Sequence, residues 1–310
     1  MNTEILKIKE EIGKAVTGKD EVIEKVLVAI LAGGHILLED IPGVGKTTLA
    51  LACTKAMGLK FNRVQFTPDV VPSDITGFTM YDKEKGSFKY NPGAAMCNFF
   101  LADEINRTSS KTQSALLEVM QEGKVTVDGV THDVPHPFIV MATQNPIGTI
   151  GTQMLPEAQL DRFMIQLSMG YPSFEDQVAI LQNRDKEDPL DKIEQVLTVE
   201  QLENMIKEAR DTFVDVKIYK YITALTEGTR NHPLVKLGVS PRGALALASI
   251  AKAEAYVQGR NFVTPEDVDK LYVDVNKHRI ILHPKAQLAD KDSTAVLEDI
   301  LKEVVAQKLD

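Results

Sequence analysis

The feature that most constrains this chain is a glycine-rich turn that lies between an apolar run and an expected helix. Residues 35–39 predict a short strand, and Lys46 opens the helical pattern. In such a unit, backbone N–H groups and the helix N-terminus bind phosphate, a lysine reaches the β- and γ-phosphates, and a hydroxyl binds Mg²⁺. Asp40 stands where the strict pattern has glycine. The sequence therefore predicts a phosphate-binding loop, and its expected binding residues are Pro42, Gly43, Val44, Gly45, Lys46, Thr47 and Thr48.

Length and composition are those of a soluble two-domain protein. The chain has 310 residues, of which 44% are hydrophobic and 25% charged, which is enough for two cores. Its net charge of −9 gives no sign of the clustered lysine and arginine of nucleic-acid-binding proteins. The sequence shows neither a signal peptide nor the roughly 18 apolar residues of a membrane span. We therefore expect a cytoplasmic protein in which Cys53 and Cys97 are small buried residues.

Apolar runs alternate with helical patterns in the first half of the chain. Short continuous runs of this kind are typical of strands buried on both faces, and their alternation with helices predicts a parallel sheet. Beyond Tyr171-Pro172-Ser173 the pattern is helical almost throughout. We therefore expect an α/β fold, with an αβα nucleotide-binding domain at residues 1–172 and a smaller all-α lid domain at 173–310. The runs after the first lie at 61–66, 96–102, 138–142 and 164–167.

Polar residues follow two of these runs at the ends of the expected strands. Hydrolysis of a phosphoanhydride needs a carboxylate for the metal, a group that orients water, and positive charge at the transition state. Asp103 and Glu104 follow the run 96–102, and strand ends are where an open α/β sheet binds ligands. We expect Asp103 to hold Mg²⁺ and Glu104 to polarise the attacking water. Asn145 follows the next run, where an amide can reach the same water. The structural alternatives are two solvated acids and a turn-forming Asn-Pro.

In these segments the sequence resembles the AAA+ ATPases, and within them the MoxR family. The resemblance covers about residues 15 to 285, and the segments stand in the family's order. In that family aspartate commonly replaces the first glycine of the loop, as Asp40 does here. The matching segments are 38–47, 101–107, 111–118, 141–146, 155–163 and 238–242.

The resemblance assigns the candidate site residues to the sequence motifs of the family. Lys46 and Thr47 correspond to the Walker A motif, and Thr47 would also bind the metal. Asp103 and Glu104 correspond to Walker B, and Asn145 resembles sensor 1. The implied cofactors are ATP and Mg²⁺.

Four further assignments rest on the resemblance alone. Arg162 resembles the arginine finger that one subunit donates to its neighbour's site, and Arg242 resembles sensor 2. Val16 and Gly18 fall where the family contacts adenine. A buried core ion pair is the structural alternative for Arg162, and an exposed helix charge is the alternative for Arg242. Whether Arg242 acts within its own subunit or across an interface stays open.

Two hairpins are expected within the first domain. Residues 70–93 contain two short arms, 78–81 and 87–90, flanked by proline and glycine, a pattern typical of a hairpin. A second hairpin is expected at about 124–134, because Asp128-Gly129 favours a type I′ turn. By the resemblance, both would project toward the axis of a ring. Rigid surface decoration is the alternative.

The resemblance implies an ATPase that couples hydrolysis to chaperone-like remodelling or maturation of partner proteins. Its implied partners are copies of itself in a ring, a hexamer by the resemblance, and protein clients, including a von Willebrand factor A domain protein. Neither nucleic acid nor membrane is expected. One alternative is a nucleotide-dependent scaffold with little turnover, in which Glu104 and Arg162 would be idle. Another is a DNA-remodelling AAA+ protein, which the acidic charge disfavours.

Overall fold

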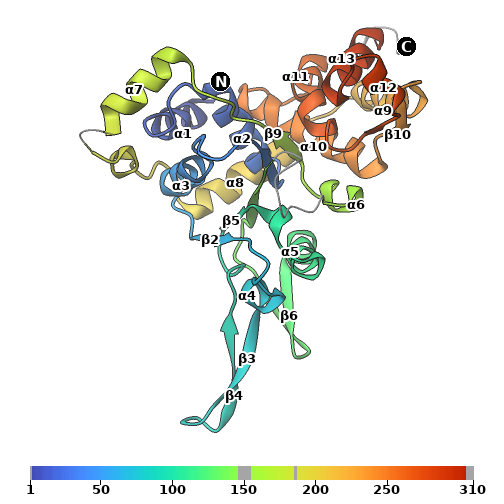
Figure 1. Cartoon of the computed structure of the whole chain (residues 1–310). Helices are drawn as coiled ribbons and strands as arrows, with labels where there is room; N and C mark the ends of the chain where they lie inside the picture. Colours follow the sequence, from blue (N-terminus) through green and yellow to red (C-terminus); the bar gives the residue numbers. More distant parts are fainter. Residues whose placement is uncertain (1, 146–154, 185–186, 305–310) are drawn as a thin grey trace.

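A five-stranded parallel sheet lies at the centre of the computed structural model, which describes residues 2–145, 155–184 and 187–304 (Figure 1). The strand order is β2-β5-β8-β1-β9, and every pairing is parallel. The carboxyl ends of the strands therefore meet at one edge. The five strands lie where the apolar runs predict them, and their bounds are β1 (Ile36–Glu39), β2 (Phe61–Gln65), β5 (Phe99–Asp103), β8 (Ile139–Gln144) and β9 (Ile165–Leu167).

Both faces of the sheet are buried, as continuous apolar runs predict. Phe99 and Leu101 point into a core shared with α1, α2 and α3, whereas Phe100 and Ala102 point into a second core with α5. Alternate residues of one strand thus serve two cores. The bounds of these helices are α1 (Thr3–Gly13), α2 (Asp20–Leu31), α3 (Lys46–Ala56) and α5 (Ser110–Glu122).

The second half of the chain is mostly helical. Thr198 and Gln201 form a capping box at the start of α8, and the hydroxyl of Ser240 caps α10. The prediction of an all-α lid is wrong in one detail, because β10 (Val235–Leu237) pairs antiparallel with β11 (Ile281–Leu282). Strands this short leave no periodic pattern in a sequence. The helices are α7 (Phe174–Arg184), α8 (Val199–Arg210), α9 (Val216–Asn231), α10 (Pro241–Val257), α11 (Pro265–Asn276), α12 (Lys285–Leu288) and α13 (Ser293–Glu303).

Further short helical elements lie between the longer ones. They are the short helices α4 (Pro72–Thr76) and α6 (Glu157–Leu160) and the 3-10 turns η1 (Ile105–Arg107) and η2 (Pro189–Lys192). None of the described helices is long and apolar enough to cross a membrane.

Both expected hairpins form. The first pairs β3 (Gly77–Asp82) with β4 (Ser87–Pro92), and the second pairs β6 (Lys124–Val127) with β7 (Val130–Asp133). Asp128 and Gly129 both have positive φ, 49° and 78°, as a type I′ turn requires. Figure 1 shows both hairpins extending away from the helices α9–α13.

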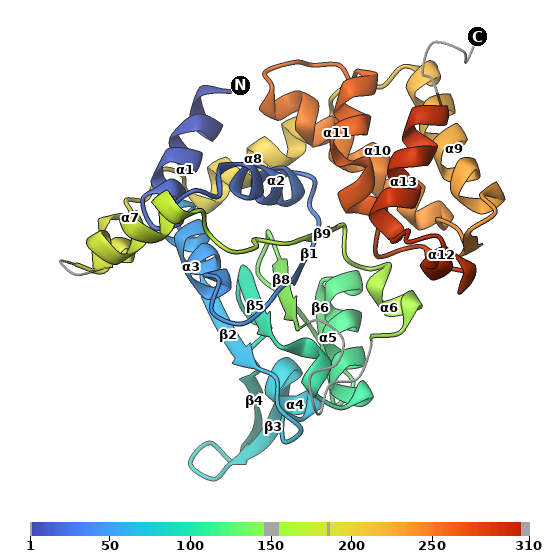
Figure 2. The same cartoon turned by 45° about the horizontal axis from the view of Figure 1, so that its top comes forward.

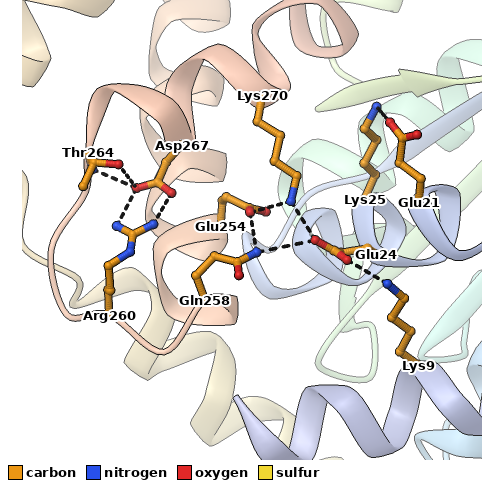
Figure 3. Close-up of polar contacts among 10 residues, drawn as sticks. All are labelled: Lys9, Glu21, Glu24, Lys25, Glu254, Gln258, Arg260, Thr264, Asp267 and Lys270. Atoms are coloured by element: carbon orange, nitrogen blue, oxygen red, sulfur yellow. Dashed lines mark hydrogen bonds and ion pairs between the residues drawn. The ribbon is translucent and has the colours of Figure 1, made fainter. Parts of the chain in front are cut away.

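The helices α1 and α2 are tied to the later helices by shared core and by ion pairs. The core that contains α1, α2 and α3 continues into α8, α10 and α11, and Figure 2 shows α8 beside α2. At the edge of this core, Glu24 of α2 accepts hydrogen bonds from Lys9 at 2.8 Å and from Lys270 at 2.6 Å (Figure 3). Lys270 also contacts Glu254 of α10, at 2.6 Å. The network fixes α11 and α10 against α2.

Candidate active site

The glycine-rich turn has the backbone shape of a phosphate-binding loop. Gly43 and Gly45 have φ of 86° and 96°, in the region that glycine adopts without strain. Gly45 is the residue before α3, and Lys46 is the first residue of that helix. The side chain of Lys46 is buried and donates a hydrogen bond to the backbone oxygen of Asp40, at 2.8 Å. Thr47 follows in the first turn of α3, so its hydroxyl lies at the helix N-terminus.

Asp40 fixes the start of this loop to the segment that follows β9. One carboxylate oxygen accepts hydrogen bonds from the hydroxyl of Ser168 at 3.1 Å and from the backbone N–H groups of Met169 and Gly170, the latter at 2.8 Å. The other oxygen accepts the N–H of Ile41 at 3.0 Å. Glycine could make none of these bonds. They give a physical reason for an aspartate at the position where the strict loop pattern has glycine.

The two acids at the end of β5 lie in different environments. Asp103 accepts hydrogen bonds from the hydroxyl of Thr143 and from Arg63, both at 2.7 Å. Glu104 has a left-handed backbone, with φ of 56°, which turns its side chain out of the strand direction. Its carboxylate accepts from the amide of Asn145 at 3.0 Å and from Arg107 at 2.6 Å. The structure thus brings Asp103, Glu104 and Asn145 together, as the sequence predicts.

The charges of the site influence one another. Burial opposes ionisation of Glu104, but the hydrogen bonds from Arg107 and Asn145 outweigh it, so the pKa of this carboxyl lies below its ordinary value. Burial lowers the pKa of Lys46, and the carboxylates of Asp40, Asp103 and Glu104 offset only part of that effect. Lys46, Arg63 and Arg107 therefore face the carboxylates of Asp40, Asp103 and Glu104 at the strand ends.

Sequence reasoning missed three residues of this site. Arg63 comes from β2, whose register sets Gln65 opposite Asp103, and nothing in the sequence indicates that register. Thr143 donates to Asp103 and accepts the backbone N–H of Glu104, at 2.8 Å. Arg107 belongs to a segment that carries the family resemblance, and its spacing of three residues from Glu104 was the available signal.

The two arginines with expected roles in hydrolysis lie away from this loop. Arg162 follows α6, and its guanidinium donates to the backbone oxygen of Leu117 in α5, at 2.6 Å. It lines a surface pocket of about 730 Å³ between α5 and the second hairpin. Figures 1 and 2 both place α6 and α3 on opposite sides of the central strands. Arg242 is exposed in the first turn of α10. Within the described part of the chain, no carboxylate pairs with either arginine.

The expected adenine segment lies between α1 and α2 and packs against the first turn of α7. Val16 is buried in the core, which leaves little of its side chain available to a ligand. Gly18 has φ of 71°, where other residues are strained, and a Cβ there would lie 2.1 Å from a carboxylate oxygen of Asp176, which would have to move. Lys19 donates to the backbone oxygen of Tyr171 at 2.9 Å. The segment and the entry to α7 are therefore packed together.

A cavity adjoins the start of the phosphate-binding loop. It has a volume of about 1440 Å³ and lies between the strand ends and residues 277–294, with Asp40, Ile41 and Asn145 in its lining. The phosphate-binding loop and the strand ends beside this cavity fit a nucleotide with Mg²⁺. The glycine turn leaves Gly43 open, with no atom within 4 Å of an added Cβ, and oxygen ligands suited to Mg²⁺ stand at Thr47 and Asp103.

Comparisons with known proteins agree with this geometry. The model of the ATPase family associated with various cellular activities (AAA) matches residues 35–165, and that of the AAA lid domain matches 227–300. The chain is 46% identical over 298 residues to uncharacterized protein YeaC of Bacillus subtilis (strain 168), covering 96% of this chain and 93% of that protein. It is 39% identical over 305 residues to Chaperone MoxR1 of Mycobacterium tuberculosis, covering 96% and 80%.

A further relative and a solved structure extend the match. Protein MoxR of Methylorubrum extorquens is 30% identical over 323 residues, covering 95% of this chain and 94% of that protein. A crystal structure from Cytophaga hutchinsonii superposes with a TM-score of 0.90 at 36% identity, covering 97% of this chain and 94% of that one. The similarity extends over nearly the whole chain, including both the loop and the helices that follow. This chain belongs to the MoxR family of AAA+ ATPases.

Proposed function

We propose that this chain is an Mg²⁺-dependent ATP hydrolase that drives chaperone-like remodelling or maturation of partner proteins. The observation that carries the proposal is the position of Glu104, which Asn145 holds at 3.0 Å beside Asp103 and within the field of Lys46. A carboxylate held ionised in this way suits the acceptance of a proton from water. The family name and the relative named Chaperone MoxR1 support the remodelling role.

Each residue of the loop has a distinct role in this proposal. Lys46 and the N–H groups of residues 42–48 hold the phosphates, while Thr47 and Asp103 hold the metal. Bound Mg-ATP supplies the phosphoanhydride and a cation that neutralises charge at the transition state. Glu104 orients the attacking water and accepts its proton, and Asn145 fixes the direction of that carboxylate. Arg107 donates to one oxygen of Glu104 at 2.6 Å and Asn145 donates to the other, and a carboxylate with two such bonds retains acceptor sites for the water.

We infer that Arg162 and Arg242 act on the site of a neighbouring subunit. Neither arginine forms an ion pair with a carboxylate among the described residues, and α6, which precedes Arg162, lies across the central strands from α3 (Figures 1 and 2). An arginine supplied in this way contributes about 10³- to 10⁵-fold to the rate of nucleotide hydrolysis. Head-to-tail sharing of sites closes into a ring, for which we propose a hexamer. The exposed apolar side chains of Phe174, Val178 and Leu181 on α7 support self-association.

The two parts of the chain would move against each other during turnover. We propose a boundary near residue 172, with the αβα domain before it and the lid after it, and with Val16 and Gly18 on the adenine side. Lid movement would shift the two hairpins, and the first of them presents Phe78 and Phe88, at 52% and 76% exposure, to a client or to a von Willebrand factor A domain partner.

The variant Glu104→Gln tests the hydrolytic role. It removes the proton acceptor and keeps the hydrogen bond to Asn145, so ATP should bind with near wild-type affinity while turnover falls about 10²-fold or more. Glu203→Gln, an exposed position on α8, is the matched control. Wild-type turnover in Glu104→Gln would refute the role of this carboxylate. ATP binding without turnover in the wild-type chain would favour the scaffold alternative.

A further inference from the structure

One carboxylate contacts both segments that carry the arginines. Asp161 directly precedes Arg162. One of its oxygens accepts a hydrogen bond from Arg279 at 2.8 Å, and the other accepts from the hydroxyl of Ser240 at 2.9 Å. Ser240 in turn accepts the backbone N–H of Gly243 at 3.2 Å and so caps α10, two residues before Arg242.

Arg279 is the buried centre of this contact. Only 7% of its surface is exposed, and it lies just beyond the end of α11. Its guanidinium also donates to the backbone oxygens of Phe163 and Met164, the latter at 3.1 Å. Arg279 therefore holds the chain on both sides of Arg162 against the lid, with a charged and geometrically fixed donor set.

The packing around Gly243 is a second observation of the same contact. A Cβ at Gly243 would lie 2.8 Å from the Cδ of Arg279 and 2.5 Å from Val239. Glycine in the first turn of α10 lets the stem of Arg279 pass directly beneath the helix start. The approach of α10 to Arg279 is thus built into the backbone as well as into the hydrogen bonds.

We propose that Asp161, Arg279 and Ser240 form a positioning unit that holds Arg162 and Arg242 in a fixed mutual arrangement, so that both enter the neighbouring site as one body. The proposal rests on the proposed action of these arginines between subunits. Among the described residues, the side-chain hydrogen bond between the turn after α6 and the start of α10 is the one from Ser240 to Asp161. With it, a movement of the lid carries both arginines together, which couples lid position in one subunit to hydrolysis in the next.

Asp161→Asn tests the unit at nearly constant volume. The change removes the charge opposite Arg279 and turns one acceptor into a donor. Because misplacement of a catalytic group by about 1 Å costs about 10²-fold, we expect turnover to fall about 10- to 100-fold while ATP affinity stays at the wild-type value. Asp191→Asn, at an exposed surface pair, is the matched control. Ser240→Ala removes only the contact to α10 and should give a smaller fall in the same direction. Loss of ATP affinity in step with turnover would contradict the proposal.

Mixed assemblies separate positioning from folding. Asp161→Asn subunits keep an intact Glu104, and Glu104→Gln subunits keep an intact positioning unit. In a random 1:1 mixture about one interface in four joins the two intact halves, so activity should recover to about a quarter of wild type, although each variant alone is nearly inactive. No recovery would overturn the role of Asp161 between subunits.

A parallel mixture of Arg162→Ala with Glu104→Gln subunits tests the shared active site separately from the positioning unit. Recovery there, without recovery for Asp161→Asn, would reject the positioning unit and leave the shared site intact. Failure of both mixtures would reject the shared site itself.

Discussion

Replacement of Lys270 by methionine should destabilise the contact between α2 and the lid helices. Lys270 bridges Glu24 and Glu254, each at 2.6 Å (Figure 3). Glu254 is 2% exposed, and one of its oxygens already has no hydrogen-bond partner among the described residues. Without Lys270 its carboxylate would retain the amide of Gln258, at 2.7 Å, and no cation.

The magnitude follows from the burial of the two partners. Breaking a buried pair by removing one partner costs about 3–5 kcal/mol. Lys270 is 35% exposed, so water can enter the vacated space, and we expect about 2–3 kcal/mol. In the double variant Glu254→Gln/Lys270→Met the uncompensated charge is gone, and the expected loss is about 1 kcal/mol. The difference of about 1–2 kcal/mol isolates the charge on Glu254 from the loss of packing.

Calorimetry at fixed protein concentration is the assay. For a chain of this size, 1 kcal/mol corresponds to about 2–4 °C in Tm, so Lys270→Met should melt about 4–12 °C below the wild type. Lys192→Met, which breaks an exposed pair with Glu187 at 3.4 Å, is the control and should change Tm little. Equal Tm values for the single and double variants would refute the reasoning, because the charge on Glu254 would then be irrelevant.

Three further perturbations have defined outcomes. Burial opposes ionisation of Glu24, but the ion pairs with Lys270 and Lys9 outweigh it and lower the pKa of this carboxyl below the ordinary 4.5. The stability that ionised Glu24 contributes is therefore present above pH 4.5 and should be lost as the pH falls through its lower folded-state pKa. Acid titration of Tm would show this loss. Asp40→Ala leaves the backbone N–H groups after β9 without their acceptor, so the free energy of unfolding should fall by about 2–3 kcal/mol. Binding of a fluorescent ATP analogue should weaken as well, and unchanged binding would contradict the anchoring role of Asp40. Burial raises the pKa of the Cys53 and Cys97 thiols to about 12, so neither should react with iodoacetamide at pH 8 until the protein is unfolded, and rapid native-state labelling would be the contrary result.

The sheet and the loop could be predicted because their signals are local. Each central strand is an unbroken apolar run, and the loop residues Gly43, Gly45 and Lys46 are contiguous. The starts of α8 and α10 also have local signals, since a cap at Thr198 or Ser240 depends on residues within one turn. The strands β10 and β11 were missed, because pairs of two or three residues have no periodicity.

The residues that tune the site could not be predicted, since their partners are distant in sequence. Arg63 reaches Asp103 only through the register of β2 and β5. Arg279 meets Asp161 from 118 residues away, where no motif marks either residue as part of a pair. Asp40 was explained by resemblance alone until its four hydrogen bonds supplied the physical reason.

Steady-state ATP turnover per protomer, measured across a wide range of protein concentration, tests the shared active site most directly. If Arg162 and Arg242 complete the site of a neighbour, turnover per protomer should rise with concentration and then saturate as subunits associate. Light scattering on the same samples should show the increase in mass over the same range. Turnover that stays constant down to concentrations at which the protein is monomeric would contradict the shared site, because a single chain would then hydrolyse ATP unaided.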